Sequence, residues 1–258
     1  MRSANFPRTR WFRSTLLGGL IAALMTLVCV APADAKVFSP EDRVQPNTTV
    51  FPYRAVVEIW STDTQDGCTG WMYGPDMVAT AAHCLYTSTG WIDFSKVEVW
   101  PGRQGATTPY PMCRIKSVGV PPEWTTSRDE RFDYAAIKLN CTVGNQTGWF
   151  NYGSQTGTLV GYPQRICGYA KDKPIHTQWC SDDQVRASDA YQLFYQNDTY
   201  YRTSGAPVLQ YNANGTWFVM GIHTYQPNHG TGNHSLYNHG TRITDILEAD
   251  LYSWRYSA

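Results

Sequence analysis

The stretch CTGWMYGPDMVATAAHC, residues 68–84, decides the fold class of this chain. It begins and ends with a cysteine, and His83 stands directly before the second one, Cys84. A lone histidine is most often an ordinary surface or core imidazole, so the phrase around it carries more information than the residue. That phrase, TAAHC at residues 80–84, together with the upstream Cys68, is the most specific signal in the sequence.

Two later segments add an acid and a hydroxyl. RFDYAAIKL, residues 131–139, places Asp133 before an apolar run, and DTYYRTSGAPVLQ, residues 198–210, carries Ser204 in a Ser-Gly-Ala-Pro turn. In the order His, Asp, Ser, these phrases resemble those of chymotrypsin-like serine proteases, whereas subtilisins and α/β-hydrolases use other orders. The resemblance implies that a buried Asp133 orients His83, and that His83 takes the proton of Ser204 as Ser204 attacks a carbonyl.

The turn before Ser204 departs from that family. Arg202 stands where glycine is usual, at a position whose backbone N–H, with the N–H of Ser204, would form the oxyanion hole. An arginine keeps the N–H, but it costs about 1 kcal/mol relative to glycine if the position needs a positive φ. Two readings stay open: an active protease with a strained or adaptable loop, and an inactive homologue that acts as a binding protein.

Three further phrases resemble one branch of the family, the V8-like glutamyl endopeptidases. They are EDRVQPNTTVFPYRAVV at residues 41–57, GIHTY at 221–225 and NHGTRIT at 238–244. The resemblance implies a serine endopeptidase that cuts protein or peptide substrates after Glu and less well after Asp. It also implies that the substrate carboxylate is bound by His223, Thr199 and the α-amine of Lys36. A buried carboxylate needs hydrogen-bond donors and a positive charge, which these groups can supply. A protease of neutral or aromatic preference remains the alternative.

The first 35 residues have the pattern of a secretory signal peptide. A basic head is followed by an apolar run at residues 16–30 and by APADA at 31–35. The apolar run is short for a membrane span, which needs about 20 residues. Cleavage after Ala35 would expose Lys36 and give a secreted, extracellular protein without membrane association. The chain has 21 basic and 21 acidic residues, a balance that gives no indication of nucleic-acid binding.

The cysteines outside the signal segment suggest three disulfides. Six remain, which allows 15 pairings. The family resemblance implies Cys68–Cys84, and sequential pairing within each half gives the other two. These are Cys113–Cys141 and Cys167–Cys180.

A histidine-rich loop near the C-terminus raises the question of a metal site. Its histidines are His223, His229, His234 and His239. Their spacing matches no compact zinc motif and the loop is rich in Gly and Asn, so we expect no metal and no cofactor.

The remaining pattern predicts an all-β protein. Short runs rich in β-branched and aromatic residues occur at 54–60, 96–100, 134–139, 206–211 and 217–223, and NANG at 212–215 separates the last two as a hairpin turn. Helical spacing is confined to residues 244–256, where Thr244 could cap a helix. Ile246, Leu247, Leu251 and Trp254 are expected on its apolar face. We therefore expect one monomeric protease domain at 36–258. The family resemblance implies that it consists of two antiparallel six-stranded β-barrels, which meet near residues 142–158, with a C-terminal α-helix.

Overall fold

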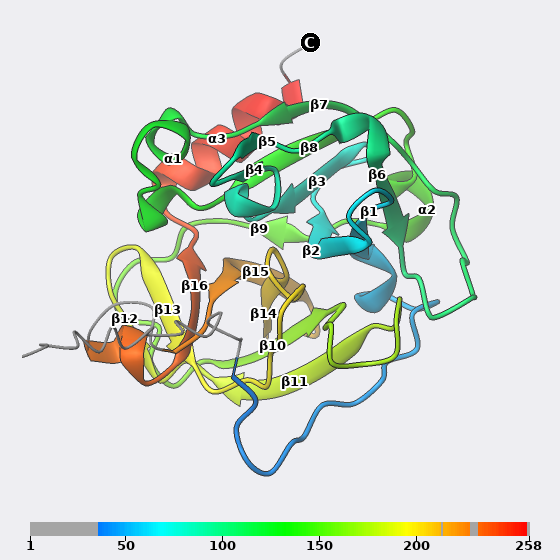
Figure 1. Ribbon diagram of the computed structural model, residues 1–258. Helices are drawn as coiled ribbons and strands as arrows, with labels where there is room; N and C mark the ends of the chain where they lie inside the picture. Colours follow the sequence, from blue (N-terminus) through cyan, green and yellow to red (C-terminus); the bar gives the residue numbers. More distant parts are fainter. Residues whose placement is uncertain (1–35, 213, 228–231, 257–258) are drawn as a thin grey trace, which may run out of the picture. The chain divides into compact units, whose positions relative to one another are not determined.

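The computed structural model describes residues 36–212, 214–227 and 232–256. The expected signal segment and His229 lie outside these ranges. Two β-sheets, which follow one another along the sequence, form the framework of the described chain (Figure 1). The chain passes from the first sheet to the second between Leu139 and Asn151, through the short helix α2 (Gly144–Thr147).

The first sheet has six antiparallel strands, as expected, in the order β6-β1-β2-β3-β8-β7. Their bounds are β1 (Val56–Ser61), β2 (Asp66–Met72), β3 (Met77–Thr80), β6 (Val97–Pro101), β7 (Ile115–Gly119) and β8 (Ala135–Leu139). A separate two-stranded ribbon pairs β4 (Tyr86–Thr87) with β5 (Gly90–Trp91). The helix α1 (Pro122–Ser127) lies between β7 and β8 in the chain. In β6, Val97, Val99 and Pro101 are buried while the residues between them are partly exposed, which is the two-residue period of a strand with one face in the core.

The second sheet has eight strands instead of the expected six. Its order is β11-β10-β14-β15-β16-β13-β12, with β9 beside β15. The bounds are β9 (Asn151–Tyr152), β10 (Pro163–Gly168), β11 (Trp179–Gln184), β12 (Ala187–Ser188), β13 (Gln192–Tyr195), β14 (Pro207–Tyr211), β15 (Trp217–Tyr225) and β16 (Asn238–Arg242). Two of these, β9 and β12, are too short to leave a period in the sequence, and β9 runs parallel to its neighbour. The predicted hairpin joins β14 to β15.

The C-terminal helix α3 (Asp245–Tyr256) begins where the sequence predicts. The Thr244 hydroxyl accepts the N–H of Leu247 at 3.3 Å, as an N-cap residue does. Leu247 and Leu251 are buried, and Trp254 packs against Gly119 of β7, where a Cβ atom would lie 2.4 Å from the indole. Figure 1 shows the helix, in red, beside the first sheet. The prediction for Ile246 is wrong, since this side chain is 53% exposed. It precedes Leu247 by one residue, which is about 100° around the helix.

Three disulfides brace the two sheets. They join Cys68 to Cys84, Cys113 to Cys141 and Cys167 to Cys180, the same pairs that the sequence analysis expects. The last of these links directly opposite residues of β10 and β11. Among the residues that the structure describes, no helix is long and apolar enough to cross a membrane.

Candidate active site

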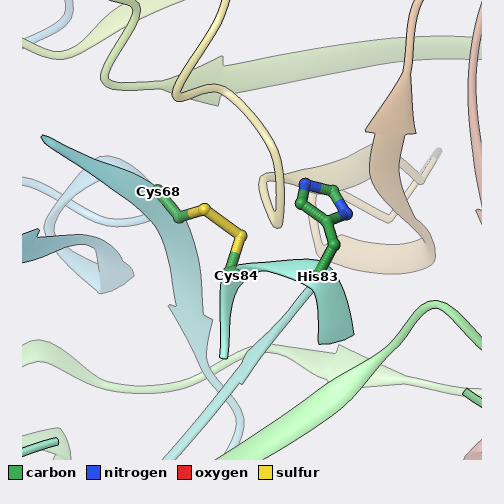
Figure 2. Close-up of side chains that lie close together, drawn as sticks. All are labelled: Cys68, His83 and Cys84. Carbon is green, nitrogen blue, oxygen red and sulfur yellow. A yellow bond between two sulfur atoms is a disulfide. The ribbon is translucent and has the colours of Figure 1, made fainter. Parts of the chain in front are cut away.

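His83 and Asp133 come together at the end of the pairing between β3 and β8. His83 lies in a short 3-10 helix directly after β3, beside the Cys68–Cys84 disulfide (Figure 2). Asp133 directly precedes Tyr134 and β8, and the register of the two strands sets Thr80 opposite Ala135. The His83 backbone N–H donates to Asp133 Oδ1 at 2.9 Å, and the ring Nδ1–H donates to Oδ2 at 2.7 Å. The carboxylate therefore holds both the backbone and the imidazole of His83.

The environment of Asp133 keeps its carboxylate charged. The residue has no exposed surface, and burial by itself raises the pKa of a carboxyl group. The charge of His83 and hydrogen bonds from His83 and Tyr225 outweigh burial and hold the pKa of Asp133 below its usual value. Tyr225 is a residue that the sequence analysis missed. Its position at the end of β15 gives no local signal, because its partner lies in the other half of the chain.

Ser204 occupies the turn before β14. The next residue, Gly205, has φ of +88°, and a Cβ atom there would lie 2.1 Å from the Thr69 carbonyl oxygen, so the turn requires glycine. The Ser204 hydroxyl donates to the Thr224 carbonyl at 3.5 Å. No hydrogen bond between Ser204 Oγ and His83 is found among the described residues, although the order His, Asp, Ser leads one to expect it. Such bonds are often long without substrate and tighten in the complex.

Ser204 and His83 nevertheless line one cavity. Its volume is about 410 Å³, and Cys68, Cys84, Trp91 and Arg202 contribute to its walls. A substrate held in this cavity would meet the serine hydroxyl and the imidazole together.

Arg202 adopts the left-handed conformation that the sequence analysis considered for it, with φ of +77°. The carbonyl before it, that of Tyr201, accepts the Lys171 N–H at 2.8 Å. A trans peptide directs its C=O and N–H groups to opposite sides, so the Arg202 N–H points away from Lys171. Within the described chain, the N–H groups of Arg202 and Ser204 donate to no protein acceptor. Both donors are therefore available to an oxygen atom of a ligand.

The Arg202 side chain is held against the first sheet. Its Nε donates to Asp66 Oδ1 at 2.6 Å and its Nη2 donates to the Gln65 carbonyl at 2.9 Å. The guanidinium carbon lies 4.9 Å from the Trp60 ring centroid, and the side chain is only 12% exposed. An ion pair and a cation–π contact thus stabilise a residue whose backbone conformation is unfavourable for any side chain.

His223 and Thr199 are both buried. His223 Nδ1 is hydrogen bonded to the Tyr195 hydroxyl at 2.8 Å. Burial, reinforced by the nearby His239 and His83, lowers the pKa of His223 to about 3, so the imidazole is neutral at neutral pH. His223 can therefore donate a hydrogen bond, but it does not itself supply a positive charge at neutral pH. The Thr199 hydroxyl makes no hydrogen bond within the described residues.

The segment that starts at Lys36 contacts Thr199 and Asn238. The Lys36 carbonyl accepts the Thr199 N–H at 3.4 Å and the Asn238 side-chain amide at 2.8 Å. The Lys36 N–H donates to Asn238 Oδ1 at 3.3 Å. Further along the segment, Asp198 accepts the backbone N–H groups of Phe38 and Asp42, at 2.6 and 2.9 Å. The sequence analysis singled out Lys36 and Thr199 but missed Asn238 and Asp198, whose roles depend on contacts across more than 150 residues.

Residues 42–249 match the trypsin family. The chain belongs to this family. A glutamyl endopeptidase of Bacillus licheniformis is 38% identical over 234 residues, which cover 88% of this chain and 72% of the relative. An extracellular metalloprotease of Bacillus subtilis is 33% identical over 258 residues, which cover 98% of this chain and 79% of that protein.

Solved structures agree with the fold. A Glu endopeptidase in complex with MPD has a TM-score of 0.74 at 24% identity and covers 86% of this chain and 100% of its own. The protease Anisep from Arthrobacter nicotinovorans has a TM-score of 0.66 at 15% identity, with coverage of 84% and 100%. The chain is a serine endopeptidase with the chymotrypsin-like fold, and it acts on protein or peptide substrates.

Proposed function

We propose that the protein is a secreted, monomeric endopeptidase that cleaves after glutamate through Ser204, His83 and Asp133. Ser204 Oγ attacks the scissile carbonyl as His83 Nε2 takes its proton, and the developing oxyanion accepts the N–H groups of Arg202 and Ser204. His83 then passes the proton to the leaving amine, which gives an acyl-enzyme. A water molecule, activated by His83, releases the product acid. The two hydrogen bonds from His83 to Asp133 support this assignment.

The preference for glutamate rests on one observation above all. The Thr199 hydroxyl is buried and makes no hydrogen bond within the described residues. Leaving such a group without a partner is unfavourable by about 1–3 kcal/mol, so a ligand that accepts its hydrogen bond is favoured there. His223 can add a second donor, because a hydrogen bond from the Tyr195 hydroxyl to Nδ1 would leave the proton on Nε2.

The positive charge is assigned to the α-amine of Lys36. Since the buried His223 is neutral at neutral pH, it does not provide this charge. Cleavage after Ala35 would turn the Lys36 N–H, now 3.3 Å from Asn238 Oδ1, into an ammonium group at the same place. Mass spectrometry of the exported protein should therefore find Lys36 as the first residue.

Catalysis and specificity are tested separately. A fluorophosphonate probe should label the protein, and Ser204→Ala should abolish labelling; a folded parent that resists the probe would favour the inactive binding protein.

For specificity, kcat/KM is compared on peptides that differ only in Glu or Gln before the scissile bond. Thr199→Val, His223→Ala and a Gly-Ser extension before Lys36 should each reduce the Glu/Gln ratio. An unchanged ratio in all three would refute the acidic pocket and leave the catalytic assignment intact.

A further inference from the structure

Outside the catalytic groups, the fold brings two imidazoles and a carboxylate together. Within the described chain, ligand atoms of Glu130, His234 and His239 all lie within 4.8 Å of one another. Glu130 precedes Asp133 in the first half, His234 belongs to a 3-10 helix (Gly232–Ser235), and His239 lies in β16. The spacing of the loop histidines gave no reason to expect a metal, because the third donor lies more than 100 residues upstream.

The distance between the imidazoles suits a shared ion. His234 Nδ1 and His239 Nε2 are 3.3 Å apart, with ring centroids 4.6 Å apart and ring planes at 76°. Two nitrogen ligands at the Zn–N distance of about 2.0–2.1 Å lie roughly 3.3 Å apart at tetrahedral angles. The two nitrogens thus already have the separation that a tetrahedral ion requires, and a side-chain rotation of the partly exposed Glu130 would supply the third ligand.

The donors are held in place by packing and backbone contacts. His239 has no exposed surface, and the Phe194 ring contacts both imidazoles, with centroids at 4.8 Å from His234 and 5.5 Å from His239. The Glu130 carbonyl accepts the Gln192 side-chain amide at 3.2 Å and the Thr241 hydroxyl at 3.4 Å. These contacts fix the segment of Glu130 against β13 and β16, so the donors come from three elements whose positions are set independently of any ion.

We infer that Glu130, His234 and His239 form a binding site for a divalent transition-metal ion of the zinc class. Two imidazoles and one carboxylate are a donor set that zinc accepts, whereas calcium and magnesium prefer oxygen ligands throughout. The ion would link the segment that carries Asp133 to β16, whose neighbour β15 carries His223. Its role would be to stabilise the junction of the two halves.

To test this site, the mature protein is treated with a chelator and then titrated with zinc. Calorimetry measures the binding, and thermal unfolding measures its effect on stability. We expect one Zn²⁺ per chain and a Tm that rises with zinc concentration. Glu130→Gln and His234→Asn should each weaken binding by at least about tenfold and remove the Tm increase. The matched control is His176→Asn, which removes a partly buried imidazole paired with Glu58, at a position of φ +64° that asparagine tolerates.

Two results would overturn the inference. One is the absence of saturable binding at submillimolar zinc. The other is equal affinity in the parent, Glu130→Gln and His234→Asn, which would place the ion elsewhere. Repeating the titration after fluorophosphonate labelling excludes His83 as the ligand, since binding at the inferred site should not change. Because the experiment measures zinc binding and thermal unfolding rather than proteolysis, its result does not depend on whether the proposed specificity is correct.

Discussion

Substitutions at Arg202 distinguish two contributions to stability: the cost of its backbone conformation in the oxyanion loop and the gain from its side-chain contacts. Arg202→Gly removes the left-handed strain, which is about 1–2 kcal/mol for an L-residue. It also removes the ion pair with Asp66 and the contact with Trp60. Arg202→Ala removes the same contacts but keeps the Cβ atom and therefore the strain. The difference in the free energy of unfolding between these two variants therefore measures the cost of the left-handed backbone conformation.

The magnitudes follow from burial and geometry. The Arg202 side chain is 12% exposed and Asp66 27%, so their hydrogen-bonded pair is worth about 1.5–3 kcal/mol, and the Trp60 contact adds about 0.5–1 kcal/mol. Arg202→Ala should therefore lower the free energy of unfolding by about 2–4 kcal/mol. Arg202→Gly should lose about 1 kcal/mol less than that, because glycine adopts the positive φ without strain.

Activity should follow a different pattern from stability. Both variants retain the backbone N–H at position 202, so kcat on a Glu peptide should stay within about threefold of the parent for Arg202→Gly. Denaturant unfolding and steady-state kinetics on the same preparations measure the two effects. A fall in kcat of about 100-fold, equal to about 2.7 kcal/mol of transition-state stabilisation, would show that the guanidinium takes part in catalysis and would refute this reasoning.

Two further variants, one of them also measured as a function of pH, test the surrounding structure. Asp133→Asn should reduce kcat by about 10³–10⁴, because the amide no longer selects the imidazole tautomer that accepts the Ser204 proton; normal activity would exclude Asp133 from the triad. The pKa of Asp133 lies below its unfolded value of about 3.9, so the carboxylate stabilises the fold above that pH and the contribution is lost as the pH falls below it. The Tm, measured between pH 5 and pH 2, should therefore fall less steeply with pH for Asp133→Asn than for the parent. Replacing Cys68 and Cys84 by serine should lower the free energy of unfolding by about 3 kcal/mol, as expected for a disulfide that closes a loop of 16 residues; an unchanged chemical denaturation midpoint would contradict this.

The sequence alone was sufficient for the fold class and for the family. The phrases around His83, Asp133 and Ser204 are short and contiguous, and their order along the chain indicates the family. The runs at 54–60, 96–100 and 134–139, which overlap β1, β6 and β8, and the cap at Thr244 are likewise local, because each depends on residues within a few positions of one another. Ile246 was misplaced because one residue along a helix changes the face by about 100°.

Only the tertiary structure decided how these residues are supported. Tyr225 reaches Asp133 from the other half of the chain, and Asn238 meets Lys36 across 202 residues, so neither contact leaves a pattern in the sequence. The neutral state of His223 depends on its burial, which is a property of the whole fold. Arg202 is the clearest case: its sequence position signals strain, but the Asp66 and Trp60 contacts that make the strain tolerable exist only because β1 and β2 fold beside the Ser204 turn.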